Sequence, residues 1–362
     1  MTAQLDPAAS GSGRPPLLSI CISTYNRAPW LARTLPHVLQ QAQPYGDLVE
    51  VLVVDNTSPD DTPALTARFS AWPNLRVHRN PKNVGMLGNL AVCAREARGD
   101  YVWVIGDDDL VLEGALERVL AALALHPDVE LVYLNYAFTR FDQPRELSRV
   151  DEVVQGAVPF STFRRDEHSP RLATIAARSP NCFTAIYCLV FRADHARGAY
   201  GQDTSGPPFS SLATCVPSTL YVVEHLMDRP AYWVGDPCLV VNMNVSWMRY
   251  ASLFILERFP EIFDRMESRG VPRAEVDALR AHHVPDLLTW LPRILFGPQR
   301  EHLGSFSTER LVRRFARVDA FAARWPEVRA LYRGAHGQGL ADDPALSPER
   351  LDAVFAAARG VR

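Results

Sequence analysis

The sequence predicts an α/β doubly wound fold with a mostly parallel sheet flanked by helices, followed by a C-terminal helical appendage. Short apolar runs alternate with amphipathic stretches over the first 138 residues, a pattern typical of parallel strands joined by crossover helices. Strands buried on both faces are therefore expected. Beyond about residue 250, helical periodicity continues to the end of the sequence.

Five apolar, β-branched runs in the first part of the chain are expected to form strands. They lie at 17–23 (LLSICIS), 49–55 (VEVLVVD), 75–80 (LRVHRN), 100–109 (DYVWVIGDDD) and 129–138 (VELVYLNYAF). Polar residues come at the ends of the first four runs. Because ligands of doubly wound folds bind beyond the carboxyl ends of the strands, these polar segments predict one shared binding site.

Four stretches between the predicted strands have the apolar spacing of helices. They cover 28–42, 62–72, 88–97 and 112–126. Pro36 makes the first of these less certain, because a proline ring inside a helix clashes with the preceding turn.

The second part of the chain is mixed and then helical. Strands are expected at 181–192 and within 231–244, and a helix is expected at 217–228. We place the boundary of the α/β domain at 248, so that the helical region covers 249–362.

Composition restricts the partners of the chain. Of its 362 residues 47% are hydrophobic, and the formal net charge is -3. A sizeable core is therefore expected, and no basic field attracts nucleic acid. The first 16 residues resemble a disordered tail rather than a signal peptide, and no apolar run reaches 18 residues, so no transmembrane segment is expected. The six cysteines form no C-x-x-C pair, which favours free thiols and a cytoplasmic location.

Three consecutive aspartates, Asp107, Asp108 and Asp109, end the fourth predicted strand. Ionised carboxylates packed together repel one another and are costly to bury. In an extended chain Asp107 and Asp109 point to one side, where they could bind a divalent cation that also contacts substrate phosphates. The alternative is that one or two of them cap the next helix or form an Asx turn. Polar segments at the neighbouring strand ends favour the metal.

Three motifs, SICISTYNR, VEVLVVDNTSPDDT and NVGMLGNLAVCAREARGDYVWVIGDDD, resemble glycosyltransferase family 2 in their order and spacing. The resemblance covers about residues 17–138. It implies a GT-A fold for a catalytic domain over 17–248 and a metal-dependent, inverting transfer of a hexose from a nucleotide-sugar to an acceptor hydroxyl. UDP-sugar is the default donor and Mg²⁺ or Mn²⁺ the expected cofactor.

The resemblance assigns donor contacts to the first two strand ends. Tyr25 would stack on the base, with Ser23, Thr24 and Arg27 beside it, and Asp55 would accept hydrogen bonds from the base or ribose. Simple loop packing of Tyr25 and an Asx turn at Asp55 are the alternatives.

The resemblance assigns further contacts to the third and fourth strand ends. Asn83, Gly85 and Asn89 match the N-x-G loop and the asparagine after it, and Gly85 permits a positive φ. Asp107 and Asp109 match the metal-binding D-x-D, with Asp109 expected to ligate directly, and Asp108 would reach the ribose or sugar. Many family members have arginine where this chain has Gly88. Arg27 or Lys82 could supply that positive charge.

The catalytic base is where the chain departs from the family. Inversion needs a carboxylate that takes the proton of the attacking hydroxyl. Members often carry Glu-Asp at the head of a helix in this region, where this chain has 217–219 (PST). The nearest carboxylates are Asp203, in a loop, and Glu224, in the predicted helix, while His195 is a lesser candidate.

The sequence leaves the acceptor open, with a small natural product or a glycan intermediate favoured. The stretch 287–297 is apolar and aromatic, and packing against the catalytic domain or a second copy of the chain is favoured over contact with a membrane surface. Two other functions remain: a non-catalytic nucleotide-sugar binder, and a sugar-phosphate nucleotidyltransferase. The latter would need a glycine-rich loop after the first strand, and STYNRAPW has no glycine.

Overall fold

The computed structural model describes residues 14–244, 247–337 and 347–360. Most of the predicted N-terminal tail, residues 1–13, lies outside this part of the chain. No helix among the described residues is long and apolar enough to cross a membrane.

The chain forms two compact units. The α/β unit consists of Met1–Thr204 and Pro217–Asn244, and the helical unit of Ser205–Val216 and Val245–Arg362.

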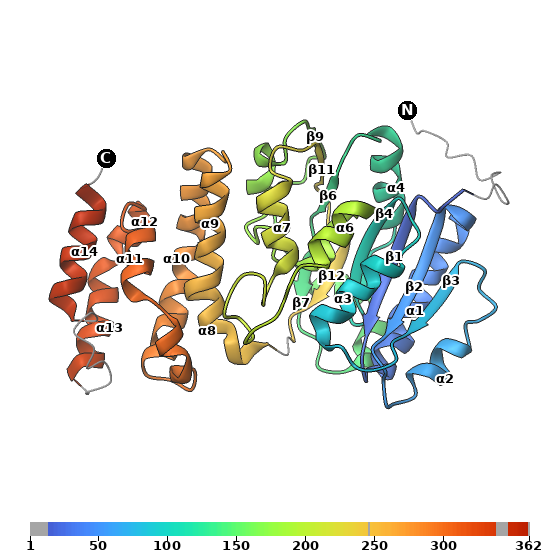
Figure 1. The fold of residues 1–362 in the computed structure, drawn as a ribbon, viewed down its shortest axis with the longest axis horizontal. Helices are drawn as coiled ribbons and strands as arrows, with labels where there is room; N and C mark the ends of the chain where they lie inside the picture. Colours follow the sequence, from blue (N-terminus) through green and yellow to red (C-terminus); the bar gives the residue numbers. More distant parts are fainter. Residues whose placement is uncertain (1–13, 245–246, 338–346, 361–362) are drawn as a thin grey trace. The chain divides into compact units, whose positions relative to one another are not determined.

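The centre of the α/β unit is a sheet in which, within the described residues, eight strands follow the order β3-β2-β1-β4-β10-β6-β11-β9 (Figure 1). β1 pairs in parallel with β2 and β4, β2 with β3, and β6 with β11, whereas β10 and β9 are antiparallel to their neighbours. The strands are β1 (Leu18–Thr24), β2 (Val49–Asp55), β3 (Leu75–Arg79), β4 (Tyr101–Gly106), β6 (Leu131–Leu134), β9 (Glu167–Ser169), β10 (Leu189–Arg192) and β11 (Ala231–Val234). This arrangement confirms the predicted doubly wound, mostly parallel sheet.

Strand register brings the predicted polar segments together at the edge of the sheet where the parallel strands have their carboxyl ends. Thr24, the last residue of β1, lies opposite Asp55, which in turn lies opposite Arg79 on β3. On the other side of β1, Ser23 lies opposite Gly106, immediately before the three aspartates.

A second sheet corrects one of the predicted strands. Its order is β5-β12-β7-β8, and its strands are β5 (Leu110–Val111), β7 (Ala137–Thr139), β8 (Val158–Pro159) and β12 (Leu239–Asn242). The predicted strand 129–138 is divided between the two sheets, because the side chain of Asn135 donates to the carbonyls of Ser161 (3.1 Å) and Gly235 (2.7 Å) at the break. The segment 231–244 forms two strands, β11 and β12, on either side of residues 235–237, as expected. Only Leu189–Arg192 of the predicted range 181–192 forms a strand.

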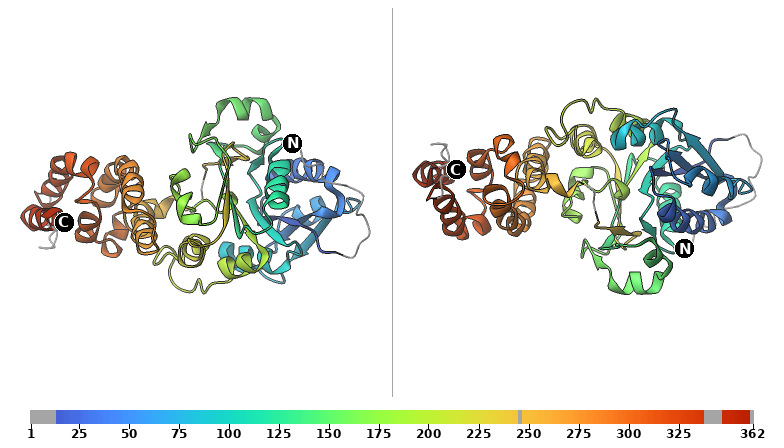
Figure 2. Two further views of the ribbon diagram at one scale, coloured as in Figure 1. Left: turned by 90° about the horizontal axis from the view of Figure 1, so that it is seen from above. Right: turned by 90° about the horizontal axis from the view of Figure 1, so that it is seen from below.

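Helices cover both faces of the large sheet (Figure 2). α1 and α4 lie on one face and α3 and α6 on the other, where α6 also packs against α7. Pro36 is accommodated inside α1. The helices of this unit are α1 (Ala28–Ala42), α2 (Thr62–Ala67), α3 (Gly85–Glu96), α4 (Ala115–Leu125), α5 (Val150–Gly156), α6 (Ala193–Tyr200) and α7 (Pro217–His225).

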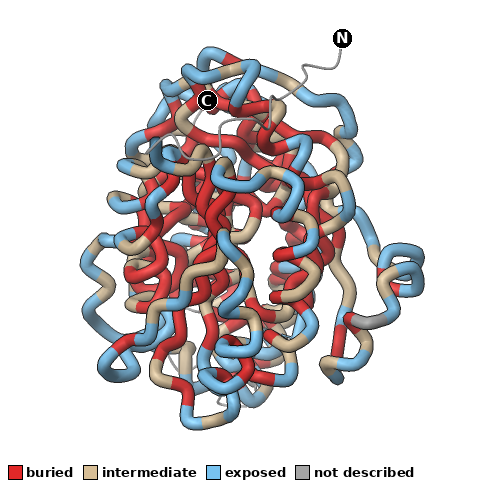
Figure 3. Tube along the Cα trace, turned by 90° about the vertical axis from the view of Figure 1, so that its right-hand side faces the viewer, coloured by how far each residue is buried: buried red, intermediate tan, exposed pale blue. Residues whose placement is uncertain are grey.

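The strands of the large sheet contribute a large part of the buried core. Figure 3 shows the buried residues in red. Every residue of β2 is buried, and β4 is buried up to Gly106. Asp107 and Asp109, which follow directly, are only 5% and 4% exposed. The fold therefore places two carboxylates at the end of a fully apolar strand.

The helical unit confirms the helical character predicted for the C-terminal region. A π-helical segment, Phe254–Arg258, joins α8 to α9, and its buried Glu257 is paired with Arg310 (2.9 Å) and Arg314 (3.5 Å). The helices are α8 (Ala251–Leu253), α9 (Phe259–Ser268), α10 (Arg273–Leu295), α11 (Thr308–Phe315), α12 (Asp319–Ala323), α13 (Trp325–Gly337) and α14 (Pro348–Gly360).

Candidate functional site

The candidate site lies at the carboxyl ends of β1, β2 and β4, around the three aspartates. Asp107 accepts a hydrogen bond from the Thr24 hydroxyl (2.7 Å) and forms an ion pair with Arg27, whose Nε lies 2.7 Å from Oδ1. Arg27 also pairs with Asp108. Burial raises the pKa of Asp107 to about 7, although the charge of Arg27 acts in the opposite direction.

Asp109 has a different environment. Its Oδ2 accepts a hydrogen bond from the backbone N–H of Gly106 (2.8 Å), and it pairs with no basic side chain in the described part of the chain. Burial, followed by the nearby charge of Asp108, raises the pKa of Asp109 to about 8. A Cβ at position 106 would lie 2.8 Å from Asp109 Oδ2, so a larger residue there would displace this carboxylate.

Asn242, at the end of β12, contacts the aspartates from the second sheet. Its side chain donates to Asp108 Oδ2 (3.0 Å), and a backbone hydrogen bond from Asn242 partly offsets the raised pKa of Asp109. The Asn242 side-chain oxygen accepts hydrogen bonds from the backbone N–H groups of Phe141 and Asn244. The sequence analysis missed Asn242, because nothing local links it to residues more than 130 positions earlier.

Asp55 and Tyr25 lie at the carboxyl ends of β2 and β1. Asp55 accepts a hydrogen bond from Ser58 N (2.8 Å) and pairs with Arg79. The backbone of Ser58 thus makes the Asx-type contact considered above. Tyr25 is 43% exposed, so its ring is accessible to a ligand.

A network of asparagine side chains joins the first three strand ends. Asn80 donates to the side-chain oxygens of Asn56 (3.0 Å) and Asn89 (2.8 Å), and Asn56 donates to Asn83 Oδ1 (2.9 Å). Asn89 donates to Ser23 Oγ (2.7 Å). The structure thus brings the predicted residues Asn83, Asn89 and Ser23 together, through Asn56 and Asn80, which the sequence analysis missed. An asparagine directly after each of the second and third strands was the available signal.

Gly85 begins α3 beside this network with φ +78°. The left-handed conformation expected from the sequence is therefore present at Gly85.

The candidate bases lie at different places along α6 and α7. Ala193 N, at the start of α6, donates to Asp100 O just before β4. Since α6 begins beside the start of β4 and packs along this strand, its C-terminal end lies toward the edge that carries the aspartates, and Asp203 follows this end by three residues. Gln202 donates to the carbonyl of Pro217, the first residue of α7, which brings this loop to the head of that helix.

His195 and Glu224 lie toward the opposite edge. His195 Nε2 is 3.1 Å from Glu130 Oε2, just before β6, and its Nδ1 is 3.0 Å from the hydroxyl of Tyr221. Glu224 follows Tyr221 by nearly one turn of α7. The structure therefore does not bring Glu224 or His195 to the aspartates.

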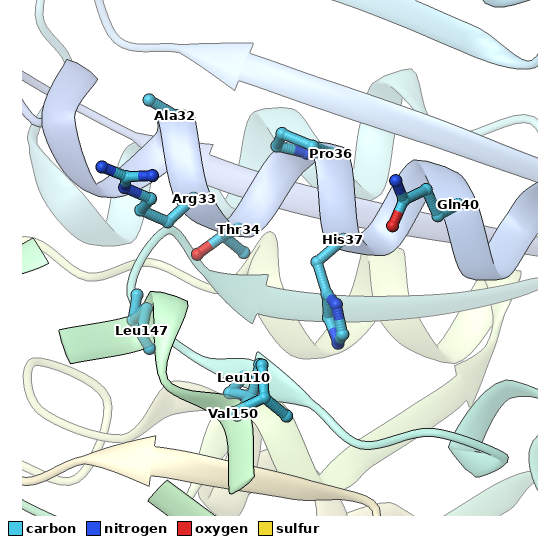
Figure 4. Close-up of a pocket in the computed structure, with 9 residues that line it drawn as sticks. All are labelled: Ala32, Arg33, Thr34, Pro36, His37, Gln40, Leu110, Leu147 and Val150. Carbon is cyan, nitrogen blue, oxygen red and sulfur yellow. The ribbon is translucent and has the colours of Figure 1, made fainter. Parts of the chain in front are cut away.

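A cavity of about 250 Å³ lies between α1 and the segment before α5 (Figure 4). Arg33, His37 and Gln40 line it from α1, and His37 is held by a 2.7 Å hydrogen bond to Val111 O. Thr34, which also lines the cavity, donates a hydrogen bond from its hydroxyl to Asp107 O (2.8 Å), so the cavity adjoins the loop of the aspartates.

The residues present fit a divalent cation at Asp107 and Asp109. Two buried carboxylates close together repel each other when both are ionised, and their raised pKa values reflect their burial and the nearby charges. Arg27 pairs with Asp107 and Asp108 but not with Asp109. Carboxylate oxygens are the ligands that Mg²⁺ and Mn²⁺ prefer. Asp109 is therefore the carboxylate most suited to such an ion.

Comparison with known proteins identifies the N-terminal part of the chain. Residues 19–185 match the model of the family described as Glycosyl transferase family 2. The abequosyltransferase RfbV of Salmonella typhimurium is 31% identical over 120 residues, which are 32% of this chain and 35% of that protein. The succinoglycan biosynthesis protein ExoO of Rhizobium meliloti is 29% identical over 162 residues, or 42% and 45% of the two chains. The chain thus spans less than half the length of these curated relatives.

Solved structures extend the similarity of the fold. A crystal structure of S. aureus TarS 1-349 superposes with a TM-score of 0.54 at 16% identity, over 94% of this chain and 91% of that one. The same fragment in complex with UDP-GlcNAc gives a TM-score of 0.51, also at 16% identity, with the same coverage. These comparisons confirm the GT-A fold.

Proposed function

Because residues 19–185 form a glycosyltransferase family 2 domain, we propose that this protein transfers a hexose from a nucleotide-sugar, a UDP-sugar in the first instance, to a hydroxyl of an acceptor. The observation that carries the proposal is the pair of buried carboxylates, Asp107 and Asp109, at the edge where β1, β2 and β4 end. The acceptor proposed from the sequence is a small natural product or a glycan intermediate.

Donor binding is assigned to the residues around the aspartates. Asp107 and Asp109 would hold Mg²⁺ or Mn²⁺, which neutralises negative charge on the diphosphate when it is bound. The exposed ring of Tyr25 is suited to stack on the base. Arg27, which is 36% exposed at its side chain, is close enough to the aspartates to contribute a positive charge to the diphosphate.

Asp203 is the proposed base. It would take the proton as the acceptor oxygen attacks the anomeric carbon from the side opposite the leaving nucleoside diphosphate, which inverts the configuration. Its position after α6, toward the edge of the aspartates, supports this role over Glu224.

The test is a search for product by mass spectrometry with a panel of nucleotide-sugars, extracted acceptors and Mn²⁺. Acceptor mass increased by one hexose, in the parent but not in Asp109→Asn, is the expected result. Donor binding without transfer or hydrolysis would instead indicate a non-catalytic binder. Pyrophosphate release from nucleoside triphosphate and sugar phosphate would indicate a nucleotidyltransferase.

A further inference from the structure

A second group of metal-binding side chains lies away from the candidate site. His126, Asp128 and His168 each offer one ligand atom within 4.8 Å of the other two. His126 and Asp128 come just before β6, which runs parallel to β4 because both are antiparallel to β10. The group therefore lies at the edge of the sheet opposite the three aspartates, which follow β4.

The backbone holds these three residues in place. The turn after α4 is closed by a hydrogen bond from Val129 N to His126 O (3.2 Å), and the hydroxyl of Tyr101 donates to Val129 O (2.8 Å). His168 is the central residue of β9 and lies opposite Tyr232 in the ladder with β11. Two ligands thus come from a fixed turn and the third from a paired strand.

The side chains already contact one another. The imidazole rings of His126 and His168 stack with their centroids 4.3 Å apart and their planes 10° from parallel. His168 Nε2 lies 3.4 Å from Asp128 Oδ2. A metal must lie in the plane of each ring that binds it, so the two rings have to turn out of their parallel stack. His168 is exposed, so its ring has room to rotate, whereas His126 is half-buried and its ring centroid also lies 5.1 Å from that of Tyr232.

We propose that His126, Asp128 and His168 form a binding site for a divalent transition-metal ion of the Zn²⁺ class. Two imidazole nitrogens and one carboxylate oxygen suit Zn²⁺, Co²⁺ or Ni²⁺, whereas the all-oxygen set at Asp107 and Asp109 suits Mg²⁺ or Mn²⁺. Water completes the coordination, because the site is open to solvent. The two sites therefore differ in both position and metal preference.

We expect a bound ion to hold the outermost strand of the sheet, β9, in place. β9 is the last strand in the order, has three residues and pairs with β11 alone within the described residues. An ion bound to His168 on β9 and to His126 and Asp128 in the turn after α4 would link this short edge strand to the segment that joins α4 to β6. Because the ion binds the folded state, it raises the apparent stability of the protein by mass action.

Zinc titration of the whole chain tests the site. After treatment with EDTA and its removal, the parent protein is titrated with Zn²⁺ in a calorimeter, and Co²⁺ is titrated in parallel to record the visible absorption of the bound ion. We expect His126→Ala and His168→Ala each to weaken binding at least about 10-fold. Asp128→Asn, which preserves the shape of the side chain, should weaken it as well, so the test does not depend on one variant.

Two controls separate this site from others. His225→Ala removes an exposed histidine of α7, and Asp109→Ala removes the proposed ligand of the catalytic metal; both should bind Zn²⁺ like the parent. Unchanged Zn²⁺ affinity in both histidine variants would overturn the proposal. Loss of Zn²⁺ binding in Asp109→Ala alone would also overturn the proposal, because it would show that the ion binds at the aspartates.

Discussion

Arg27 Nε lies 2.7 Å from Asp107 Oδ1, and the same guanidinium pairs with Asp108. A side-chain cation therefore already contacts one of the two carboxylates assigned to the metal. The charge of Arg27 lowers the pKa of Asp107, whereas burial raises it to about 7. Arg27 thus has two opposing effects on metal binding: it keeps Asp107 ionised, and it repels the incoming cation.

Arg27→Ala should make metal affinity more dependent on pH. Without the guanidinium the pKa of Asp107 rises, so protons compete with Mn²⁺ more strongly at pH 6, while the repulsion is absent at pH 9. The ratio of the Mn²⁺ dissociation constants at the two pH values should increase, by about tenfold for each unit of pKa change. Calorimetric titration measures it. Arg33→Ala, in the helix that follows Arg27, is the control, and an equal change of affinity at both pH values in Arg27→Ala would contradict the account.

Asn89→Ala should destabilise the fold. The mutation removes the donor to Ser23 Oγ (2.7 Å) and Val54 O (3.1 Å) and the acceptor of Asn80 (2.8 Å), which leaves buried polar groups without partners. The free energy of unfolding should fall by about 1–3 kcal/mol, as measured by urea denaturation. Asn83→Ala, at an exposed position of the same network, should cost clearly less. Equal losses in the two variants would mean that burial of the network does not determine its contribution.

Asp203→Asn should abolish most turnover and leave donor binding intact. Loss of a general base reduces kcat by about 10²–10⁴-fold, whereas the KM for the nucleotide-sugar should change little. Glu224→Gln is the matched control and should retain activity within a few-fold. If Glu224→Gln is the inactive variant, the proposed base is wrong although transfer itself remains supported.

Metal-free stability should decrease as pH rises from about 4 to about 8. In this range Asp109, with a pKa of about 8 in the folded protein, binds a proton that the unfolded chain, with its ordinary value of 3.8, does not bind. Proton uptake by the folded state means that the free energy of unfolding falls with rising pH. Asp109→Asn removes this contribution, so in EDTA at pH 8.5 it should be more stable than the parent, on the order of 1–3 kcal/mol.

Urea denaturation at pH 5.5, 7 and 8.5 compares Asp109→Asn with the parent. Saturating Mg²⁺ should stabilise the parent most at pH 8.5, where the carboxylates are ionised. A stability difference between variant and parent that stays constant with pH would show that Asp109 does not titrate in the folded protein.

The local sequence was sufficient to predict the buried strands whose residues are almost all apolar. β2 occupies the predicted run 49–55 without a shift. β1 and β3 differ from their predicted ranges by one or two residues. The aspartates were likewise recognisable, because three charges at the end of an apolar strand are unusual without a binding role.

The features that the sequence did not predict depend on contacts between residues far apart in the chain. The break between β6 and β7 depends on Asn135, which bonds to Gly235, 100 positions later. Asn242 reaches Asp108 across 134 positions. Such pairs leave no local pattern, and neither does the approach of His126 to His168, which depends on the position of the short strand β9.

Binding of UDP with and without Mn²⁺, compared by calorimetry in the parent and Asp109→Asn, tests the central claim most directly. If the aspartates hold the ion that binds the diphosphate, Mn²⁺ should tighten UDP binding to the parent at least about tenfold, or 1.4 kcal/mol, and should have no effect on the variant. An equal Mn²⁺ effect in the two proteins would contradict the account.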